Sequence, residues 1–333
     1  MRTAVVTAIL FVIVAIVLAI GAGEQTGPNR FVVLGVVNGA VFGLMALGLV
    51  LVYKGTRVFN FMQGEFGTFG AYLLFIAIED INMAYGFGIV FALAGVVVAG
   101  LMVERVIIRP LINSPRITVL VATIAIALLA VGIQILVFRI DPKALSPIMQ
   151  TVDAAGVPQG LTVFELPIEP QRLIAVATLL SFGILLGWFF SRTDLGLAVL
   201  ATSQDAFATR VVGIGVERMS RFIWGSAALL GGIAGLLYIP VAGALLPGVM
   251  SSNILIPAFT GAVIGGMTSL PGAFVGGVTI GLVQALSLWA AGHYFIGERA
   301  LAEVIPGAEQ LSILAVLLLV LLARPQGLLG TEA

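Results

Sequence analysis

The sequence lacks several residue types on which enzyme chemistry depends. It has no cysteine and one histidine, His293, so disulfides, thiol catalysis and the usual zinc-ligand sets are excluded. Its lysines are Lys54 and Lys143, and neither ends a Walker A loop, so the chain has no P-loop for ATP. Neither a G-x-S-x-G elbow nor an H-E-x-x-H pair occurs. We therefore expect no catalytic residues, no metal site and no cofactor in this chain.

Charge is also scarce. Only 10% of the residues are charged, against roughly a quarter in an ordinary soluble domain, and 60% are hydrophobic. The formal net charge of +0 excludes the basic surface of a nucleic-acid-binding protein. The 41 glycines fit a lipid environment, because membrane helices associate through small residues that let backbones approach. We predict an all-α integral membrane protein with one transmembrane domain over residues 1–333.

Apolar segments of about the 20 residues that a spanning helix needs recur along the chain. We predict about 10 transmembrane helices, at 4–22, 31–53, 65–79, 84–103, 117–139, 171–190, 222–240, 254–268, 272–291 and 310–323. The third, eighth and tenth are short, and such segments can be tilted, broken or shielded from lipid by neighbours. Residues 1–25 also resemble a signal peptide, but their apolar run is long for one, and we favour a retained first helix.

The positive charges give an orientation. With the N-terminus inside, eleven of the 16 Lys and Arg residues fall on the cytoplasmic side and five fall outside. Lysine and arginine collect on cytoplasmic loops, so we predict that both termini are cytoplasmic. Spans 2–5 and 7–10 then begin from opposite sides, and each set has a short second member. That is the outline of an inverted repeat.

Two loops are long enough to have structure of their own. In this topology residues 140–170 form an external loop, and the pattern at 161–164 predicts a small hairpin. Residues 191–221 form a cytoplasmic loop, in which we predict a helix from about 203 to 212 that ends at Gly213. An amphipathic helix there lies on the membrane or docks on a protein, and a solvated connector is the alternative.

Glycines at four-residue intervals mark expected helix seams. Such spacing lines one helix face and lets another backbone approach closely. We expect close packing at Gly35, Gly39 and Gly43, at Gly231 and Gly235, and at Gly272, Gly276 and Gly281.

The segment 60–72, NFMQGEFGTFGAY, carries a family resemblance. It resembles the permease subunits of branched-chain amino acid ABC importers, on the LivH side of the LivH/LivM family. The usual pattern there is N-F-A-H-G-E, followed by an aromatic residue and G-A-Y. Met62 and Gln63 replace the common Ala-His pair.

Three further stretches resemble the same family in the expected order. Residues 196–214 are similar to its cytoplasmic coupling segment, with Leu200 where a basic residue is common. Residues 265–273 match its G-G-x-G-S-x-P-G-A signature, with Thr268 in place of glycine. Residues 324–330 match its R-P-x-G-L-x-G ending. Together the resemblance covers the chain from about residue 31 to 330.

The resemblance implies half of the membrane part of a type II ABC importer in a bacterial or archaeal cytoplasmic membrane. Its partners would be a second, LivM-like permease, two ATP-binding cassette ATPase subunits that bind the ATP, and an external solute-binding protein. A coupling helix would contact an ATPase subunit. The residues that make this contact or end the helix would be Asp205, Arg210, Gly213 and Ile214. The resemblance allows branched-chain amino acids, other amino acids, urea or amides, and aromatic or short acids as the solute.

Two groups of residues are candidates for the pathway and its support. We expect Asn60, Gln63, Gly64 and Glu65 to line or gate the substrate pathway. The structural alternative is that Asn60 caps the short helix and Glu65 neutralises the positive N-terminal end, and both can hold together. A second group is expected to form the tight turn between spans 8 and 9 and to pack these helices: Gly265, Gly266, Ser269, Pro271 and Gly272.

A different class of function is a passive channel or facilitator for a small neutral solute. A channel should show symmetric polar or charged rings, and none is evident in the sequence. Proton- or sodium-coupled carriers usually have several acidic residues within their spans, and here only Glu65 is placed to lie inside the bundle. We therefore expect an ATP-coupled permease subunit, with the channel as the alternative.

Overall fold

The computed structural model describes most of the chain beyond the first predicted helix. The described residues are 28–111, 114–148, 151–152, 158–159, 161–163, 166–168, 170–204, 206–211, 213–293, 295–296, 299–324 and 327. The predicted first span, 4–22, lies outside them, so neither alternative for residues 1–25 is tested.

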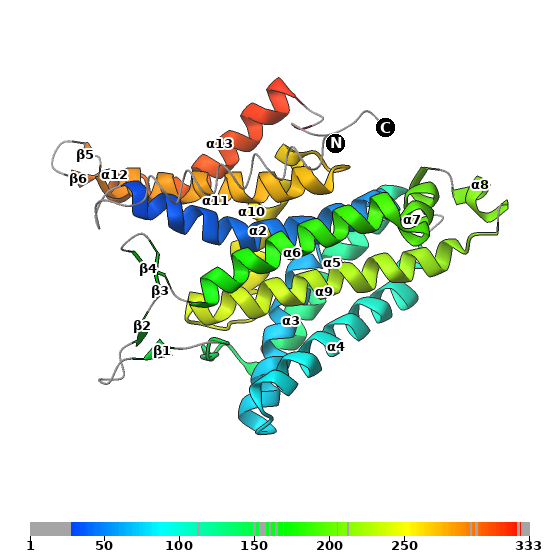
Figure 1. Ribbon diagram of the computed structural model, residues 1–333, viewed down its shortest axis with the longest axis horizontal. Helices are drawn as coiled ribbons and strands as arrows, with labels where there is room; N and C mark the ends of the chain where they lie inside the picture. Colours follow the sequence, from blue (N-terminus) through cyan, green and yellow to red (C-terminus); the bar gives the residue numbers. More distant parts are fainter. Residues whose placement is uncertain are drawn as a thin grey trace. The chain divides into compact units, whose positions relative to one another are not determined.

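The described chain is helical, which confirms the predicted fold class (Figure 1). The α-helices are α2 (Pro28–Thr56), α3 (Gln63–Phe75), α4 (Tyr85–Val103), α5 (Arg116–Phe138), α6 (Pro170–Arg192), α7 (Asp194–Gln204), α8 (Ala206–Val211), α9 (Val216–Ala242), α10 (Ile256–Gly265), α11 (Leu270–His293), α12 (Leu301–Val304) and α13 (Ala308–Ala323). Three π-helical turns, η1 (Ile76–Asp80), η2 (Glu104–Ile108) and η3 (Ser251–Leu255), adjoin α3, α4 and α10.

Strands are short and confined to loops. They are β1 (Thr151–Val152), β2 (Pro158–Gln159), β3 (Leu161–Val163), β4 (Leu166–Ile168), β5 (Phe295–Ile296) and β6 (Arg299–Ala300). β3 and β4 pair antiparallel, with Leu161 opposite Ile168 and Val163 opposite Leu166. The hairpin predicted within 140–170 is therefore confirmed.

Six helical segments of the described chain are long and apolar enough to cross a membrane. They are Phe31–Thr56, Tyr85–Ile108, Arg116–Phe138, Pro170–Arg192, Val216–Ala242 and Leu270–His293. The segments Ser251–Gly265 and Ala308–Ala323 are shorter apolar helices, as is α3. Each predicted span from 31–53 onward thus falls on a helix. The N-in, C-in orientation and the inverted repeat stay predictions.

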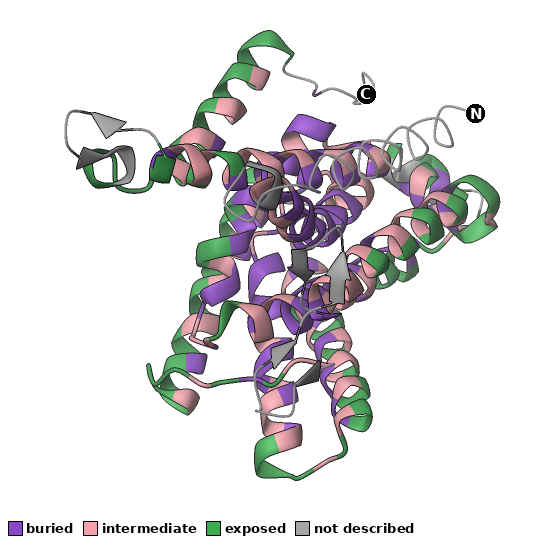
Figure 2. Cartoon of the chain, turned by 60° about the vertical axis from the view of Figure 1, so that its left-hand side comes forward, coloured by how far each residue is buried: buried purple, intermediate pink, exposed green. Residues whose placement is uncertain are grey.

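Large apolar side chains are exposed on some of these helices. Phe87 at the start of α4 is 75% exposed and Leu136 on α5 is 84% exposed. Contiguous exposed apolar surface of this kind would be costly in water and is ordinary in contact with lipid. Figure 2 shows buried and exposed residues alternating along single helices, as expected of helices with one face toward protein and another toward lipid.

The chain divides into two compact units. Unit 1 consists of Met1–Ala46, Met149–Ser181 and Pro257–Ala333, and unit 2 consists of Leu47–Ile148 and Phe182–Ile256. Within unit 1, α11 packs against α12 and α13. Within unit 2, α3, α4 and α9 pack against one another, and α3 also contacts α5 and η3. Phe66, Tyr72 and Trp224 are fully buried in this second unit.

The predicted glycine seams bring backbones together in both units. In unit 1 a Cβ at Gly39 would lie 2.7 Å from the Cα of Val278, so α2 and α11 are in backbone contact there. In unit 2 a Cβ at Gly235 on α9 would overlap the backbone of Gly67 on α3. Only glycine fits at such crossings, which confirms the packing role predicted for these glycines.

Residues 191–221, predicted to form a cytoplasmic loop, contain more helix than predicted. The helix predicted from about residue 203 corresponds to α8, which begins at Ala206, but a further helix before it, α7, was not predicted and begins at Asp194. The Thr193 hydroxyl accepts the backbone N–H of Gly196 at 3.0 Å, which is an N-cap bond. This cap signal was present in the sequence and was missed. The predicted end is confirmed, because Gly213 has φ +83° and the Ile214 N–H donates to the Thr209 carbonyl at 3.1 Å.

Candidate functional site

The first turns of α3 bury an unusual number of polar side chains for a membrane protein. Asn60, Gln63, Glu65 and Thr68 are each 0% exposed. Burying such groups is costly unless they find hydrogen-bond partners, and within a membrane they mark functional positions. These residues lie where α4, α5, α9 and η3 surround α3. The candidate site is therefore built around the start of α3.

One half of the site is a fully bonded network that anchors α3. The Asn60 Oδ1 accepts the Met62 N–H at 3.0 Å, and Asn60 Nδ2 donates to Gln63 Oε1 at 3.2 Å. Gln63 Nε2 in turn donates to the carbonyl of Ala227 on α9 at 2.8 Å. The N-cap position of α3 belongs to Met62, which makes no side-chain cap bond. Asn60 thus supports the helix start from two residues further out, instead of capping it directly.

The other half of the site joins three elements through Glu65. Gln134 on α5 donates from Nε2 to Glu65 Oε2 at 2.8 Å, and its Oε1 accepts the N–H of Gly248 at 3.0 Å. Thr68 accepts the N–H of Met250 at 3.3 Å. Glu65 and Thr68 lie three residues apart on one face of α3, so both face the segment before η3. This face links α3, α5 and the chain around residues 248–250.

Three buried oxygens form no well-aligned hydrogen bond among the described residues: Glu65 Oε1, Tyr72 Oη and Ser251 Oγ, of which the last faces the Glu65 carboxyl group. Tyr72 lies on the Glu65 face of α3, seven residues on, and its ring stacks on Phe138 with centroids 3.9 Å apart. Ser251 approaches from η3, and a Cβ at Gly64 would lie 2.8 Å from the Ser251 Cα. Gly64 is therefore required for η3 to come this close. Buried oxygens left unbonded are available to a polar ligand.

A separate ion network lies where α4 and η2 meet α9. Arg109 Nη2 lies 2.8 Å from the Oε2 of Glu104, whose side chain is 0% exposed, and Arg109 Nη1 lies 3.2 Å from the Oε2 of Glu217, which is 63% exposed. The hydrogen bond to Glu104 raises the pKa of the Arg109 guanidinium, so this side chain stays charged. The pair neutralises a carboxylate that would otherwise be buried as a lone charge.

We expect Arg109→Gln to lower the melting temperature of the purified protein by several degrees, because it leaves Glu104 buried and unpaired. Glu217→Gln should change it by less than a degree, since exposed ion pairs contribute little. Thermal unfolding followed by circular dichroism measures both. Equal effects of the two substitutions would contradict this division of roles.

The turn between α10 and α11 contains the second group of candidate residues. Gly266 has φ +96°, and its carbonyl accepts the Ser269 N–H at 2.9 Å. Ser269 precedes α11, and its Oγ accepts the Gly272 N–H at 3.1 Å, which is an N-cap bond. Pro271 stands in the first helical turn, where a missing N–H costs nothing. A Cβ atom at Gly265 would overlap the backbone of Gly272, and a Cβ atom at Gly272 would overlap the backbone of Gly265.

Ser269→Ala should lower the free energy of unfolding by about 1 kcal/mol, because it removes the acceptor for an orphan N–H of α11. Ser269→Asp keeps an acceptor and serves as the matched control. Chemical unfolding in detergent measures the difference, and an alanine variant as stable as the aspartate variant would show that the cap is unimportant.

The sequence profile described as "Branched-chain amino acid transport system / permease component" matches residues 31–322. This range includes every residue of the candidate site. The chain belongs to this family of permease components.

Curated relatives match the permease over most of its length. It is 30% identical over 304 residues to the "High-affinity branched-chain amino acid transport system permease protein BraD" of Pseudomonas aeruginosa, covering 89% of this chain and 94% of the relative. It is 28% identical to LivH of Escherichia coli K12, over 89% of this chain and 93% of the relative. A probable LivH of Methanocaldococcus jannaschii is 27% identical, over 87% and 88%. No solved structure matches the chain.

The structure of the permease brings some predicted residues together and leaves others apart. Asn60, Gln63, Gly64 and Glu65 form one buried group at the start of α3. In the segment predicted to couple to an ATPase, Gly213 and Ile214 form the end of α8. Asp205 lies outside the described residues, as does the side chain of Arg210.

Sequence reasoning missed two residues of the permease site, Gln134 and Ser251. Gln134 had a usable signal, because it is the only amide in the apolar segment 117–139, and a polar group in a span is a functional candidate by default. Ser251 had none. It lies against Gly64, beside Glu65, only because η3 packs onto α3 at that glycine.

Proposed function

We propose that this permease is the membrane-spanning subunit of an ATP-driven importer for branched-chain or related amino acids. The observation that carries the proposal is the continuous family match over residues 31–322. The relatives from Pseudomonas aeruginosa and Escherichia coli are named as high-affinity branched-chain amino acid permeases, which supports this substrate class. The chain itself hydrolyses nothing. Two separate ATPase subunits bind ATP, and an external solute-binding protein delivers the amino acid.

The Glu65 face of α3 forms part of the substrate pathway in this proposal. An amino acid carries an ammonium group that needs acceptors and an apolar side chain that does not. Glu65 Oε1, Ser251 Oγ and Tyr72 Oη are buried oxygens without other partners, and they supply such acceptors. Asn60 and Gln63 form hydrogen bonds with each other and with the backbones of Met62 and Ala227. These bonds position α3.

Energy enters through the segment 191–221. We place it on the cytoplasmic side of a bacterial or archaeal inner membrane, with both termini on the same side. Asp205, Arg210, Gly213 and Ile214 belong to the surface that an ATPase subunit contacts. ATP binding moves this surface and switches the pathway between two states, in the manner of a ligand that biases a two-state element. A second, LivM-like permease completes the pathway, and the predicted inverted repeat of spans 2–5 and 7–10 lies within this chain.

A passive channel or facilitator finds no support in the comparisons. The matched family and the relatives are transport-system permease components throughout. The ATP-coupled subunit is therefore the one function we propose.

The deciding experiment measures ATP hydrolysis by vesicles that contain the permease with its candidate partners. We expect solute and binding protein to stimulate hydrolysis, and Asp205→Ala with Arg210→Ala to abolish the stimulation while assembly persists. Uptake of solute at the same rate in vesicles without any ATPase would overturn the proposal and make a facilitator the leading function.

A second substitution tests the coupling segment through its backbone. Gly213→Ala forces a side chain into the left-handed region at φ +83°, which costs roughly 1–2 kcal/mol. We expect α8 to lose its defined end and stimulated ATP hydrolysis to fall about fivefold or more, because a misplaced surface couples poorly. Gly215→Ala is the matched control, since Gly215 has φ −76°. Equal hydrolysis in the two variants would remove Gly213 from the coupling surface.

A further inference from the structure

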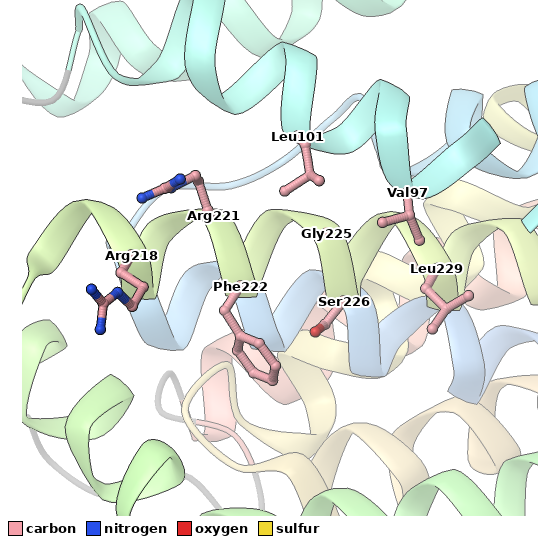
Figure 3. Close-up of a pocket in the computed structure, with 8 residues that line it drawn as sticks. All are labelled: Val97, Leu101, Arg218, Arg221, Phe222, Gly225, Ser226 and Leu229. Carbon is pink, nitrogen blue, oxygen red and sulfur yellow. The ribbon is translucent and has the colours of Figure 1, made fainter. Parts of the chain in front are cut away.

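A groove runs between α4 and α9 in unit 2, outside the candidate site. It has a volume of about 660 Å³ and opens to the surroundings. Its lining includes Val97 and Leu101 from α4 and Arg218, Arg221, Phe222 and Leu229 from α9. Figure 3 shows Val97 and Leu101 on α4 directed toward α9, and the two arginines gathered at one end of the groove.

Most of the side chains that line the groove are apolar. Val97, Leu101 and Leu229 contribute aliphatic side chains, and Phe222 is 40% exposed. Gly225 adds no side chain to the floor, where a Cβ would lie 3.4 Å from the Leu101 Cδ2. The open volume of about 660 Å³ is thus bordered mainly by aliphatic and aromatic side chains. Such a surface suits the acyl chain of a lipid.

The two arginines at the end of the groove have no carboxylate partner among the described residues. The only carboxylate nearby on α9, Glu217, is paired with Arg109. Arg221 Nε donates to the Glu217 backbone carbonyl at 3.4 Å, which leaves its charge unneutralised. Each guanidinium group has five N–H donors and binds anions. Because the two groups lie beside an apolar groove, a ligand with both an anionic and an apolar part would match the site.

We propose that this groove binds an anionic phospholipid, with the phosphate held by Arg218 and Arg221 and an acyl chain lying against Val97, Leu101 and Leu229. Both α4 with η2 and α9 are long and apolar enough to cross a membrane. The arginines lie in the first turns of α9 and therefore at the level of the lipid headgroups, where basic pockets between helices recognise anionic lipids. The inference does not depend on the substrate or on the direction of transport.

Native mass spectrometry of the assembled complex tests the site with palmitoyl-oleoyl phosphatidylglycerol and, separately, with the phosphatidylcholine of the same chains. We expect retained phosphatidylglycerol on the wild type and at least a fivefold loss in the double variant Arg218→Gln, Arg221→Gln. Arg116→Gln, an exposed arginine at the start of α5, is the matched control and should retain the lipid. Phosphatidylcholine should be retained weakly by all three proteins.

A second variant keeps the test valid if the double variant fails to assemble. Gly225→Leu retains both charges and fills the floor of the groove, and it should also lose phosphatidylglycerol. Equal retention of phosphatidylglycerol and phosphatidylcholine by the wild type, or full retention in the double variant, would overturn the proposal. A complex that assembles with no retained lipid would assign the groove to a partner subunit and would also overturn it.

Discussion

Replacing Glu65 by glutamine is expected to reduce amino-acid uptake at least tenfold while the complex still assembles. Glutamine keeps the size of the side chain and can still accept the hydrogen bond that Gln134 donates at 2.8 Å. It replaces the carboxylate that would pair with a substrate ammonium by a neutral amide. A hydrogen bond to a charged group contributes roughly 1.5–3 kcal/mol, and 1.4 kcal/mol corresponds to about tenfold in rate. Uptake of labelled leucine into proteoliposomes with the full set of partners measures the effect.

The matched control for Glu65 lies on the same helical run. Glu79, in η1, is exposed, so Glu79→Gln removes a charge of the same kind from the surface. Its uptake should equal that of the wild type. If Glu65→Gln transports normally, Glu65 is a structural tie between α3 and α5 and the pathway lies elsewhere. Loss of assembly in Glu65→Gln alone would also favour the structural role.

Replacing Gly235 by alanine is expected to lower the free energy of unfolding by at least about 3 kcal/mol, the upper part of the range for overpacking. The added methyl group would overlap the backbone of Gly67, which cannot rotate away as a side chain can. α9 would have to move off α3, and the network from Asn60 to the Ala227 carbonyl would be stretched. Unfolding in a denaturing detergent mixture, followed by tryptophan fluorescence, measures the loss.

Gly132 on α5 provides the matched control for Gly235. It stands inside a helix, and a Cβ there meets nothing within 4 Å. Alanine at Gly132 should leave stability unchanged or raise it by roughly 0.5–1 kcal/mol, because glycine is a poor helix former. Opposite signs for the two substitutions would separate close packing from helix propensity. Destabilisation of both by the same amount would show that the α3–α9 crossing is not especially tight.

The buried polar group at the start of α3 illustrates how a site and a scaffold share residues. Gln63 holds α3 against α9, and Glu65 is held by α5, so the same turn is fixed from both sides. With its first turn fixed, α3 presents Glu65, Thr68 and Tyr72 in a constant geometry. Rigid support of this kind favours ligand binding, because the entropy cost of ordering loosely held side chains reduces the affinity.

Much of this protein could be predicted from patterns within single segments. Low charge and long apolar runs predicted the helices, and the described helices occupy the predicted positions from 31–53 onward. Four-residue glycine spacing predicted the backbone contacts at Gly39 and Gly235. A β-rich stretch between turn residues predicted the hairpin of β3 and β4. Each of these features depends on local periodicity or composition, which can be read directly from the sequence.

Contacts between distant segments were decided only by the tertiary structure. That Glu65 meets Gln134 depends on how α5 packs beside α3, and that Arg109 pairs with Glu217 depends on how η2 packs against α9. The groove at Arg218 and Arg221 is likewise formed by residues of both α4 and α9, which lie far apart in the sequence. Helix formation is a local property of the chain in lipid, whereas the choice of neighbours depends on the shapes of several helices at once. The sequence by itself therefore determined the class, the helices and the family motifs, and only the packed helices determined which polar side chains meet.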